Sequence, residues 1–281
     1  LNLLVSDLKS NNKNNSINAN NPYYLYYQYL PFRSKTVYTA QELNNYIADN
    51  TNSDSKLRGL GQALKDAEAK YGVNALLTLA VAINESAWGT STIAQSKNNL
   101  FGMKAYDNNV NAAQTFNTQG DSVLEFAKTY ISKGYANPTD WRNYGGHLGN
   151  KSLGANVKYA SDPFWGEKAT KFAFGVDLAL SKNVNSLRDT NRYQLGIYTD
   201  NQQVKDKDNK ELYTSKAGTS FVLLSKDKVN IGGQNLSPIY PEITSTNFTG
   251  EYNWNNGYIN TSRIKLINTQ KNVQPELVVY G

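Results

Sequence analysis

Cysteine is absent from the 281-residue chain, and histidine occurs once. The lack of cysteine excludes disulfides, thiolate metal sites and cysteine nucleophiles. Metal catalysis has little support, because His147 is the only histidine and the HExxH pattern does not occur. A Ser-His-Asp mechanism would have to use His147, which lies in GGHLG and is expected to be a surface or loop residue. We therefore expect no metal site.

Several other features are missing. No glycine-rich phosphate loop occurs, so no nucleotide cofactor is indicated and we expect none of any kind. The longest apolar run, Leu76–Ile83, is too short for a membrane span. No signal peptide opens the chain, and because Leu1 is not a natural start we expect a fragment whose targeting segment lies outside it.

The net charge of +6 suits either a nucleic acid or an acidic cell-wall polymer as partner. The basic residues form no dense run and alternate with acids, as in KDKDNKE. Nucleic acid is therefore not expected, whereas anionic wall polymers remain possible partners. A mildly basic protein without an anionic partner explains the charge equally well.

The composition changes twice along the chain, which predicts three parts. Residues 1–55 are a polar, asparagine-rich lead-in followed by an aromatic-rich segment, in which Thr39 to Glu42 (TAQE) is a capping box. Helical signals dominate residues 56–183. Residues 184–281 hold short β-forming segments such as RYQLGIYTD, separated by Asn, Gly and Asp turns.

Local signals place several helices in the middle part. Apolar residues recur at helical spacing before Gly72, which supplies a stop, and Asn74 is expected to cap the next helix, LLTLAVAINE. Asp162 is expected to be an N-cap, with Pro163 at the first helical position. Residues 98–159, rich in glycine, asparagine and aromatics, predict loops and short helices around a cleft.

One carboxylate stands out, because Glu85 closes the apolar run in AVAINESAWG. A glutamic acid in an apolar pocket keeps its proton near neutral pH and can donate it to a leaving oxygen, as in the lysozyme example of an acid walled by tryptophan. Trp88 lies three residues later and would face the same cleft if the helix continued that far. A glutamate simply exposed at a helix end is an equally good interpretation of the composition.

The motif around Glu85 favours the catalytic interpretation. NESAWGTSTIAQSKNNLFGMKA resembles glycoside hydrolase family 73, the bacterial endo-β-N-acetylglucosaminidases, whose pattern is ESxWGxSxxA followed by NNLFGxK. KYASDPFW is similar to the family's second signature, YATDPxY. The resemblance covers about residues 56–182, and LPFRSKTVYTAQELNNYI is similar to the lead-in of Gram-positive wall autolysins. It implies a lysozyme-like helical lobe with a cleft that cleaves the bond from GlcNAc to MurNAc in peptidoglycan.

The resemblance also assigns roles to individual residues. It makes Glu85 the general acid and Tyr159 a catalytic tyrosine that orients water or steadies the cationic transition state, although a packed aromatic is the plainer interpretation of Tyr159. Trp88 and Asp162 are candidate substrate-binding residues, with N-capping the alternative for Asp162. The remaining substrate-binding candidates are Asn99 as a sugar contact, Phe101 and Gly102 as packing on the floor of the cleft, and Trp165 either on the wall of the cleft or in the hydrophobic core.

A second carboxylate is not assigned by the motifs. Retaining glycosidases need a partner at about 5 Å from the acid and inverting ones at roughly 6.5–9.5 Å, whereas the N-acetyl group of the substrate can replace a protein nucleophile. We place Asp107 slightly ahead of the other candidates, which are Asp121, Glu125, Asp140 and Asp162.

The sequence thus predicts an α+β protein: a predominantly helical, lysozyme-like catalytic domain with a cleft, plus a small β-rich C-terminal module. GYINTSRIKL is similar to the closing strand of Src-homology-3-like wall-binding barrels, and an accessory lobe that binds nothing is the alternative. We expect a secreted, monomeric hydrolase of peptidoglycan glycan strands at a Gram-positive cell wall. The alternatives are a lytic transglycosylase, whose GLMQ-type segment is replaced here by NLFGMK, and a non-catalytic cell-wall-binding module.

Overall fold

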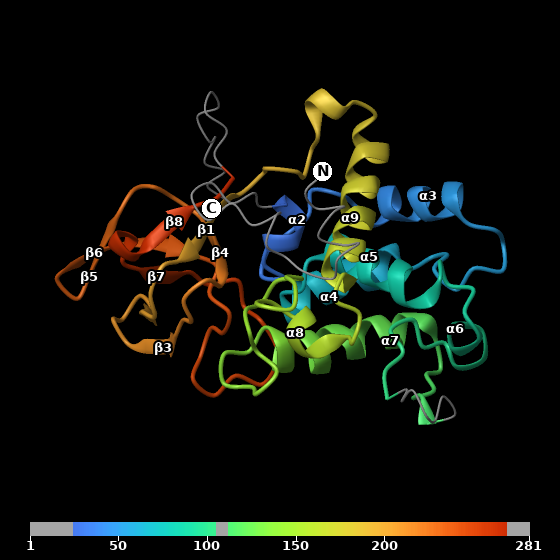
Figure 1. Cartoon of the computed structure of the whole chain (residues 1–281), viewed down its shortest axis with the longest axis horizontal. Coiled ribbons are helices and arrows are strands. Elements are labelled where there is room, and N and C mark those ends of the chain that lie inside the picture. The colour runs from blue at the N-terminus through green and yellow to red at the C-terminus, as the bar shows by residue number, and fades with distance from the viewer. Residues whose placement is uncertain (1–24, 105–111, 269–281) are drawn as a thin grey trace.

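The computed structural model describes residues 25–104 and 112–268 as a helical part followed by an antiparallel sheet (Figure 1). This mixture agrees with the predicted α+β class. The helical elements are α2 (Tyr26–Tyr29), α3 (Ala40–Asn50), α4 (Gly61–Tyr71), α5 (Ala75–Ser86), α6 (Thr92–Lys97), α7 (Gln119–Glu125), the π-helix η2 (Phe126–Tyr135), α8 (Asn156–Tyr159), α9 (Trp165–Ser181) and the 3₁₀ turns η3 (Val184–Ser186) and η4 (Thr261–Arg263).

The sheet is built from eight short strands. Their order is β3-β2-β7-β6-β4-β1-β8, and β5 pairs with β6 in a hairpin. Their bounds are β1 (Gln194–Tyr198), β2 (Gln203–Lys205), β3 (Glu211–Thr214), β4 (Ser220–Leu223), β5 (Val229–Ile231), β6 (Gln234–Ile239), β7 (Gly257–Ile259) and β8 (Ile264–Leu266).

Several predicted boundaries are confirmed. Thr39 and Glu42 form the capping box of α3, because each side chain accepts a hydrogen bond from the other residue's backbone N–H. The Asn74 side chain accepts from the backbone N–H groups of Leu76 and Leu77 and so caps α5. Gly72 ends α4 in the left-handed conformation, at φ 64°.

At the level of single residues, one prediction was wrong and another was confirmed only in part. The helix α9 begins at Trp165 rather than Pro163, because the Asp162 carboxylate accepts from the Phe164 N–H and closes a turn before the helix. His147 is in a loop but is not on the surface. It is fully buried, forms a β-bridge with Pro31 and stacks on Tyr29 at 5.4 Å between ring centroids.

The region expected to hold only loops and short helices contains a longer helical segment. The α-helix α7 runs directly into the π-helix η2, so residues 119–135 are helical without a break. Within the described residues, no helix combines the length and apolar character that crossing a bilayer requires.

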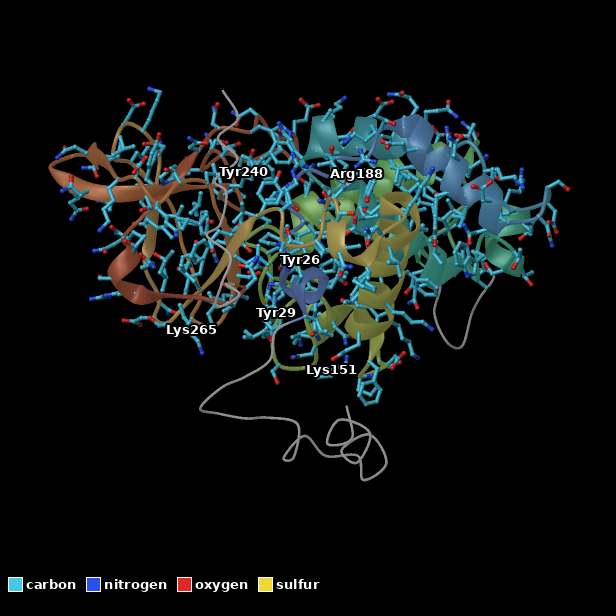
Figure 2. The ribbon with its side chains drawn as sticks, turned by 90° about the horizontal axis from the view of Figure 1, so that it is seen from above. Tyr26, Tyr29, Lys151, Arg188, Tyr240 and Lys265 are labelled. Carbon is cyan, nitrogen blue, oxygen red and sulfur yellow. The ribbon has the colours of Figure 1, made fainter. Side chains whose placement is uncertain are left out.

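The largest hydrophobic core includes residues from both the helices and the sheet. Tyr193, Leu195, Val222 and Tyr240 come from the sheet part and pack with the buried face of the helices, whereas a second, smaller cluster lies within the sheet part alone. Tyr26 of α2 and Tyr240 lie between the two parts in Figure 2, and the Tyr26 hydroxyl accepts from the Tyr193 N–H. The division at residues 183 and 184 therefore remains a prediction.

A buried arginine joins four segments at this contact. Arg33 is 1% exposed, and its guanidinium donates to the backbone oxygens of Tyr71, Ser132 and Glu242. It also lies over the Tyr252 ring at 4.4 Å. Because one rigid group satisfies acceptors from the helical part and the sheet part, Arg33 fixes how they meet.

Candidate active site

The end of α5 determines where Glu85 lies. The helix stops at Ser86 because Ala87 and Trp88 adopt left-handed conformations, at φ 49° and 61°. Gly89 follows at φ 77°, and a Cβ there would come within 2.7 Å of the Leu57 backbone nitrogen. The segment SAWG is thus a tight turn against residues 55–57, and it leaves Glu85 on the last turn of an otherwise apolar helix.

Two neutral donors hold one oxygen of the Glu85 carboxyl group. The Trp165 indole Nε1–H donates to Glu85 Oε1 at 2.5 Å, and the Asn84 side-chain amide donates to the same oxygen at 3.2 Å. Burial raises the pKa of Glu85 above its ordinary value, and the charge of Asp162 adds to this, whereas the two donors partly offset it. No lysine or arginine in the described part of the chain forms an ion pair with Glu85.

Tyr159 lies beside this pair. Its ring stacks on the Trp165 indole with 4.4 Å between centroids, and its hydroxyl donates to the Phe101 carbonyl at 3.5 Å. Burial, and next the negative charge of Glu85, raise the pKa of the Tyr159 phenol. The structure therefore brings Glu85, Tyr159 and Trp165 together from three separate helices.

The start of α9 is held against the loop after His147. A Cβ at Gly166 would lie 1.9 Å from the Gly149 carbonyl oxygen, so only glycine permits this approach. The preceding Trp165 is 2% exposed and points at Glu85. Close backbone packing at Gly166 thus sets the position of the indole N–H.

Trp88 does not make the contact that the sequence suggested. The helix ends before it, and its ring packs between Tyr46 at 6.3 Å and Phe172 at 5.7 Å. The tryptophan that touches Glu85 is Trp165, which is 80 residues away in sequence. In the sequence, Trp165 stood out only as the aromatic residue after DPF in the second motif. Its distance along the chain from Glu85 did not indicate that the two side chains meet.

Asn99 is occupied inside its own loop. It is 1% exposed, its amide donates to the carbonyls of Met103 and Gln114, and its side-chain oxygen accepts from the N–H groups of Phe101 and Met103. This leaves no hydrogen-bonding capacity for a sugar, so the structure gives Asn99 a loop-shaping role in place of the expected sugar contact.

Phe101 and Gly102 complete this loop. The Phe101 ring stacks on Phe126 with 3.9 Å between centroids, and Phe126 in turn meets Tyr159 edge-on. Gly102 has φ 61° with open space where a Cβ would point, so backbone conformation rather than crowding favours glycine there. Phe101 is therefore linked to the ring of Tyr159 through Phe126.

The candidate second carboxylates differ in their surroundings. Asp107 lies outside the described residues. Asp121 closes the capping box of α7, and Asp140 forms an ion pair with Arg142. Glu125 is half-buried at the end of α7. Among the described candidates, Asp162 is the one whose charge raises the pKa of Glu85, and it pairs with Lys168 at 2.5 Å.

The described residues also contain no group of three or more histidine, aspartate or glutamate side chains arranged to hold a metal ion.

Residues 61–178 match the family model described as mannosyl-glycoprotein endo-beta-N-acetylglucosaminidase. This segment is a glucosaminidase-family domain. Glu85, Tyr159 and Trp165 all lie within it, and the resemblance noted from the motifs is confirmed. The family is one of glycoside hydrolases.

Two proteins of Streptococcus pneumoniae, both named "Putative endo-beta-N-acetylglucosaminidase", are 41% identical over 138 residues. These matches cover 47% of this chain and 20% or 18% of the relatives, so the chain spans about a fifth of their length.

Solved structures of autolysins give weaker likenesses. A catalytic mutant of S. aureus autolysin E in complex with the disaccharide NAG-NAM is 20% identical with a TM-score of 0.42, covering 53% of this chain and 71% of that chain. A major bifunctional autolysin is 21% identical with a TM-score of 0.41, covering 55% and 68%. At these scores, function must be argued from this chain's own residues.

Proposed function

We propose that this chain is a peptidoglycan hydrolase that cleaves the β-1,4 bond between GlcNAc and MurNAc, with Glu85 as the general acid. The observation that carries the proposal is the environment of Glu85. Burial raises the pKa of its carboxyl group, and no cation pairs with it among the described residues. A carboxylic acid that keeps its proton near neutral pH is what a glycosidase needs to protonate a leaving oxygen.

The hydrogen bonds indicate which oxygen carries the proton. Both the Trp165 indole and the Asn84 amide donate to Oε1, so Oε1 acts as acceptor. The proton is then held on Oε2 and is delivered from there. In this proposal Trp165 and Asn84 are positioning residues, because they orient the acid without touching the reacting atoms.

Tyr159 is proposed to help stabilise the cationic transition state, as its family motif implies. The proximity that lets the charge of Glu85 raise the pKa of Tyr159 supports this placement. The second catalytic group remains Asp107, Asp162 or the substrate's own N-acetyl group. The ion pair with Lys168 restrains the Asp162 carboxylate, so Asp162 is not preferred over the other two. Trp88, Phe101 and Gly102 stay proposals for substrate binding.

The wider setting follows from the same proposal. The helical part, residues 56–183, would form the lysozyme-like lobe with its cleft, and residues 184–281 would modulate wall attachment without contributing a catalytic group. The proposal includes a secreted, monomeric enzyme at a Gram-positive wall, and the streptococcal relatives support the Gram-positive assignment.

The test is Glu85→Gln, which keeps the size and hydrogen-bonding reach of the side chain and removes the proton. We expect a normal circular dichroism spectrum and hydrolysis reduced by about 10²–10⁴-fold, measured by release of soluble muropeptides from purified walls. Glu251→Gln, a change at an exposed glutamate on the sheet part, is the matched control and should keep full activity.

The products separate the alternatives. Mass spectrometry of the digest should find reducing GlcNAc ends. Anhydro-MurNAc ends would instead identify a lytic transglycosylase, and wall-loaded gels without a cleared band would identify a binding module. Near-normal hydrolysis by folded Glu85→Gln would refute the catalytic role of Glu85.

A further inference from the structure

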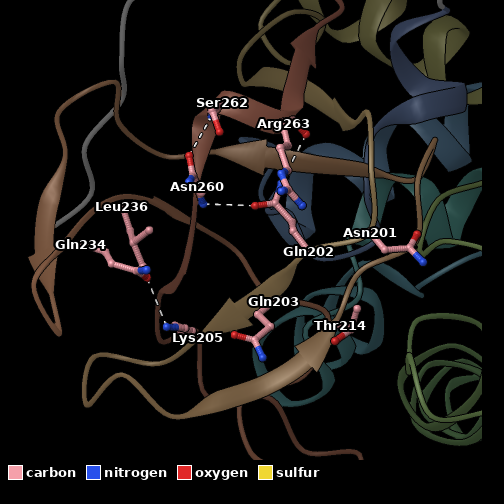
Figure 3. A pocket seen from close by; sticks show the side chains of 10 residues that line it. All are labelled: Asn201, Gln202, Gln203, Lys205, Thr214, Gln234, Leu236, Asn260, Ser262 and Arg263. Carbon is pink, nitrogen blue, oxygen red and sulfur yellow. Dashed lines mark hydrogen bonds between the residues drawn. The ribbon is translucent and has the colours of Figure 1, made fainter.

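The sheet part carries a polar pocket that the proposed chemistry does not use. It has a volume of about 510 Å³ and lies between β2, β3, β6 and the connection from β7 to β8 (Figure 3). Five of its ten lining residues have side-chain amides: Asn201, Gln202, Gln203, Gln234 and Asn260. Lys205 and Arg263 add positive charge, no carboxylate lines the pocket, and Leu236 is its one large apolar side chain.

Gln202 is held at both ends, because its Oε1 accepts from the Asn260 N–H and its amide nitrogen donates to the Arg263 carbonyl. Three other amides are held by their oxygen alone. Asn260 Oδ1 accepts from the Ser262 N–H at 2.9 Å, and Asn201 Oδ1 accepts from the Ala217 N–H at 2.9 Å. Gln234 Oε1 accepts from Lys205 Nζ at 3.2 Å, a bond visible in Figure 3. Their NH₂ groups make no hydrogen bond to any described residue, so each presents fixed, unused donors on exposed side chains.

Gln203 presents the complementary group. Its amide nitrogen donates to Glu211 at 2.7 Å, which leaves its carbonyl oxygen as a free acceptor. Lys205 donates only to the neutral oxygens of Asn209 and Gln234, so no carboxylate in the described part of the chain neutralises its ammonium. The pocket therefore combines fixed amide donors, an amide acceptor and one uncompensated positive charge.

This chemistry fits a peptide better than a sugar. A peptide backbone displays one N–H and one C=O per residue, which side-chain amides match in both directions. A pyranose ring has an apolar face that needs apolar or aromatic cover, and Leu236 alone cannot provide it. The ammonium of Lys205 would hold a carboxylate through a charge-assisted hydrogen bond.

We propose that this pocket binds a short, extended peptide that carries a free carboxylate. It would do so independently of Glu85, because its residues belong to the sheet and Glu85 to the helical part. The peptide side chains of peptidoglycan would be the source of such a ligand, an identification that rests on the proposed function. The inference that the pocket binds such a peptide does not depend on the proposed function.

The experiment is a titration of the full ¹⁵N-labelled chain, followed by NMR. The probe is the tripeptide L-Ala-D-isoGln-L-Lys, whose only carboxylate is at the C-terminus, compared with its C-terminal amide and with a GlcNAc tetramer. We expect saturable shifts at the pocket residues with the free acid, weaker binding of the amide, and no shifts there with the tetramer.

Variants give the decisive comparison. Lys205→Ala should weaken tripeptide binding about tenfold, because it removes a hydrogen bond to a charged group. Lys228→Ala, the same change at an exposed lysine that directly precedes β5 and lies outside the pocket, should leave affinity unchanged. Glu85→Gln should bind the tripeptide like the unmodified chain, so loss of hydrolysis and loss of peptide binding are separate results.

Three outcomes would overturn the proposal. One is the absence of shifts at millimolar tripeptide, and another is binding that Lys205→Ala leaves unchanged. The third is saturable shifts at the pocket with the GlcNAc tetramer in place of the tripeptide, which would make the pocket a glycan site.

Discussion

The hydrogen bond from Trp165 to Glu85 predicts a shift in the pH profile of hydrolysis. At 2.5 Å this bond stabilises the ionised form of the carboxyl group and so lowers the pKa that burial raises. Trp165→Phe keeps an aromatic ring against Tyr159 and removes the N–H donor. The pKa of Glu85 should therefore rise further in this variant.

The size of the shift follows from the kind of bond lost. A hydrogen bond to a charged group contributes about 1.5–3 kcal/mol, which corresponds to roughly 1–2 pKa units. Because the general acid must be protonated, the alkaline limb of the kcat/KM profile should move to higher pH by that amount. The smaller ring also leaves space, so the free energy of unfolding should fall by about 1–3 kcal/mol.

The assay is the rate of release of soluble muropeptides from purified walls as a function of pH, with circular dichroism to establish folding. Trp88→Phe is the matched control, because Trp88 makes no hydrogen bond to Glu85 and its ring packs on Tyr46 and Phe172. Its alkaline limb should not move. An unchanged or lowered limb in folded Trp165→Phe would refute the positioning role of the indole.

Three further predictions concern stability. Burial raises the pKa of Glu242 from its ordinary 4.5 to about 7, so its contribution to stability is greatest below pH 4.5 and is lost as pH rises through 7. The free energy of unfolding should fall by about 3 kcal/mol over this range, and Glu242→Gln should reduce the matching fall of Tm with pH. An unaltered slope of Tm against pH would contradict this. Arg33→Met leaves several buried carbonyls without a hydrogen-bond donor and should lower the free energy of unfolding in urea by at least about 3 kcal/mol. A loss below about 1 kcal/mol would show that stability does not depend on Arg33. Gly89→Ala forces a Cβ into the backbone at Leu57 and should cost about 1–3 kcal/mol in thermal unfolding, whereas Gly175→Ala, inside α9 with open space around it, should be neutral or stabilising; equal effects would be inconsistent with a strained turn.

Local signals in the sequence were enough to predict the ends of several helices. The capping box at Thr39, the cap at Asn74 and the stop at Gly72 each act through hydrogen bonds or backbone angles within a few residues. The position of Glu85 at the end of an apolar helix was predicted for the same reason. The strand within RYQLGIYTD was also expected, because its β-forming residues are contiguous.

Only the tertiary structure decided which distant residues meet. Trp165 reaches Glu85 across 80 residues of sequence because α9 packs along α5, and no local pattern encodes that contact. The burial of His147 likewise depends on its bridge to Pro31, more than a hundred residues earlier. Trp88 is three residues from Glu85 yet turns away, since the helix ends at Ser86 and both Ala87 and Trp88 itself are left-handed. Sequence neighbours share a helix face only while the helix continues, whereas contacts between helices depend on how the whole core packs.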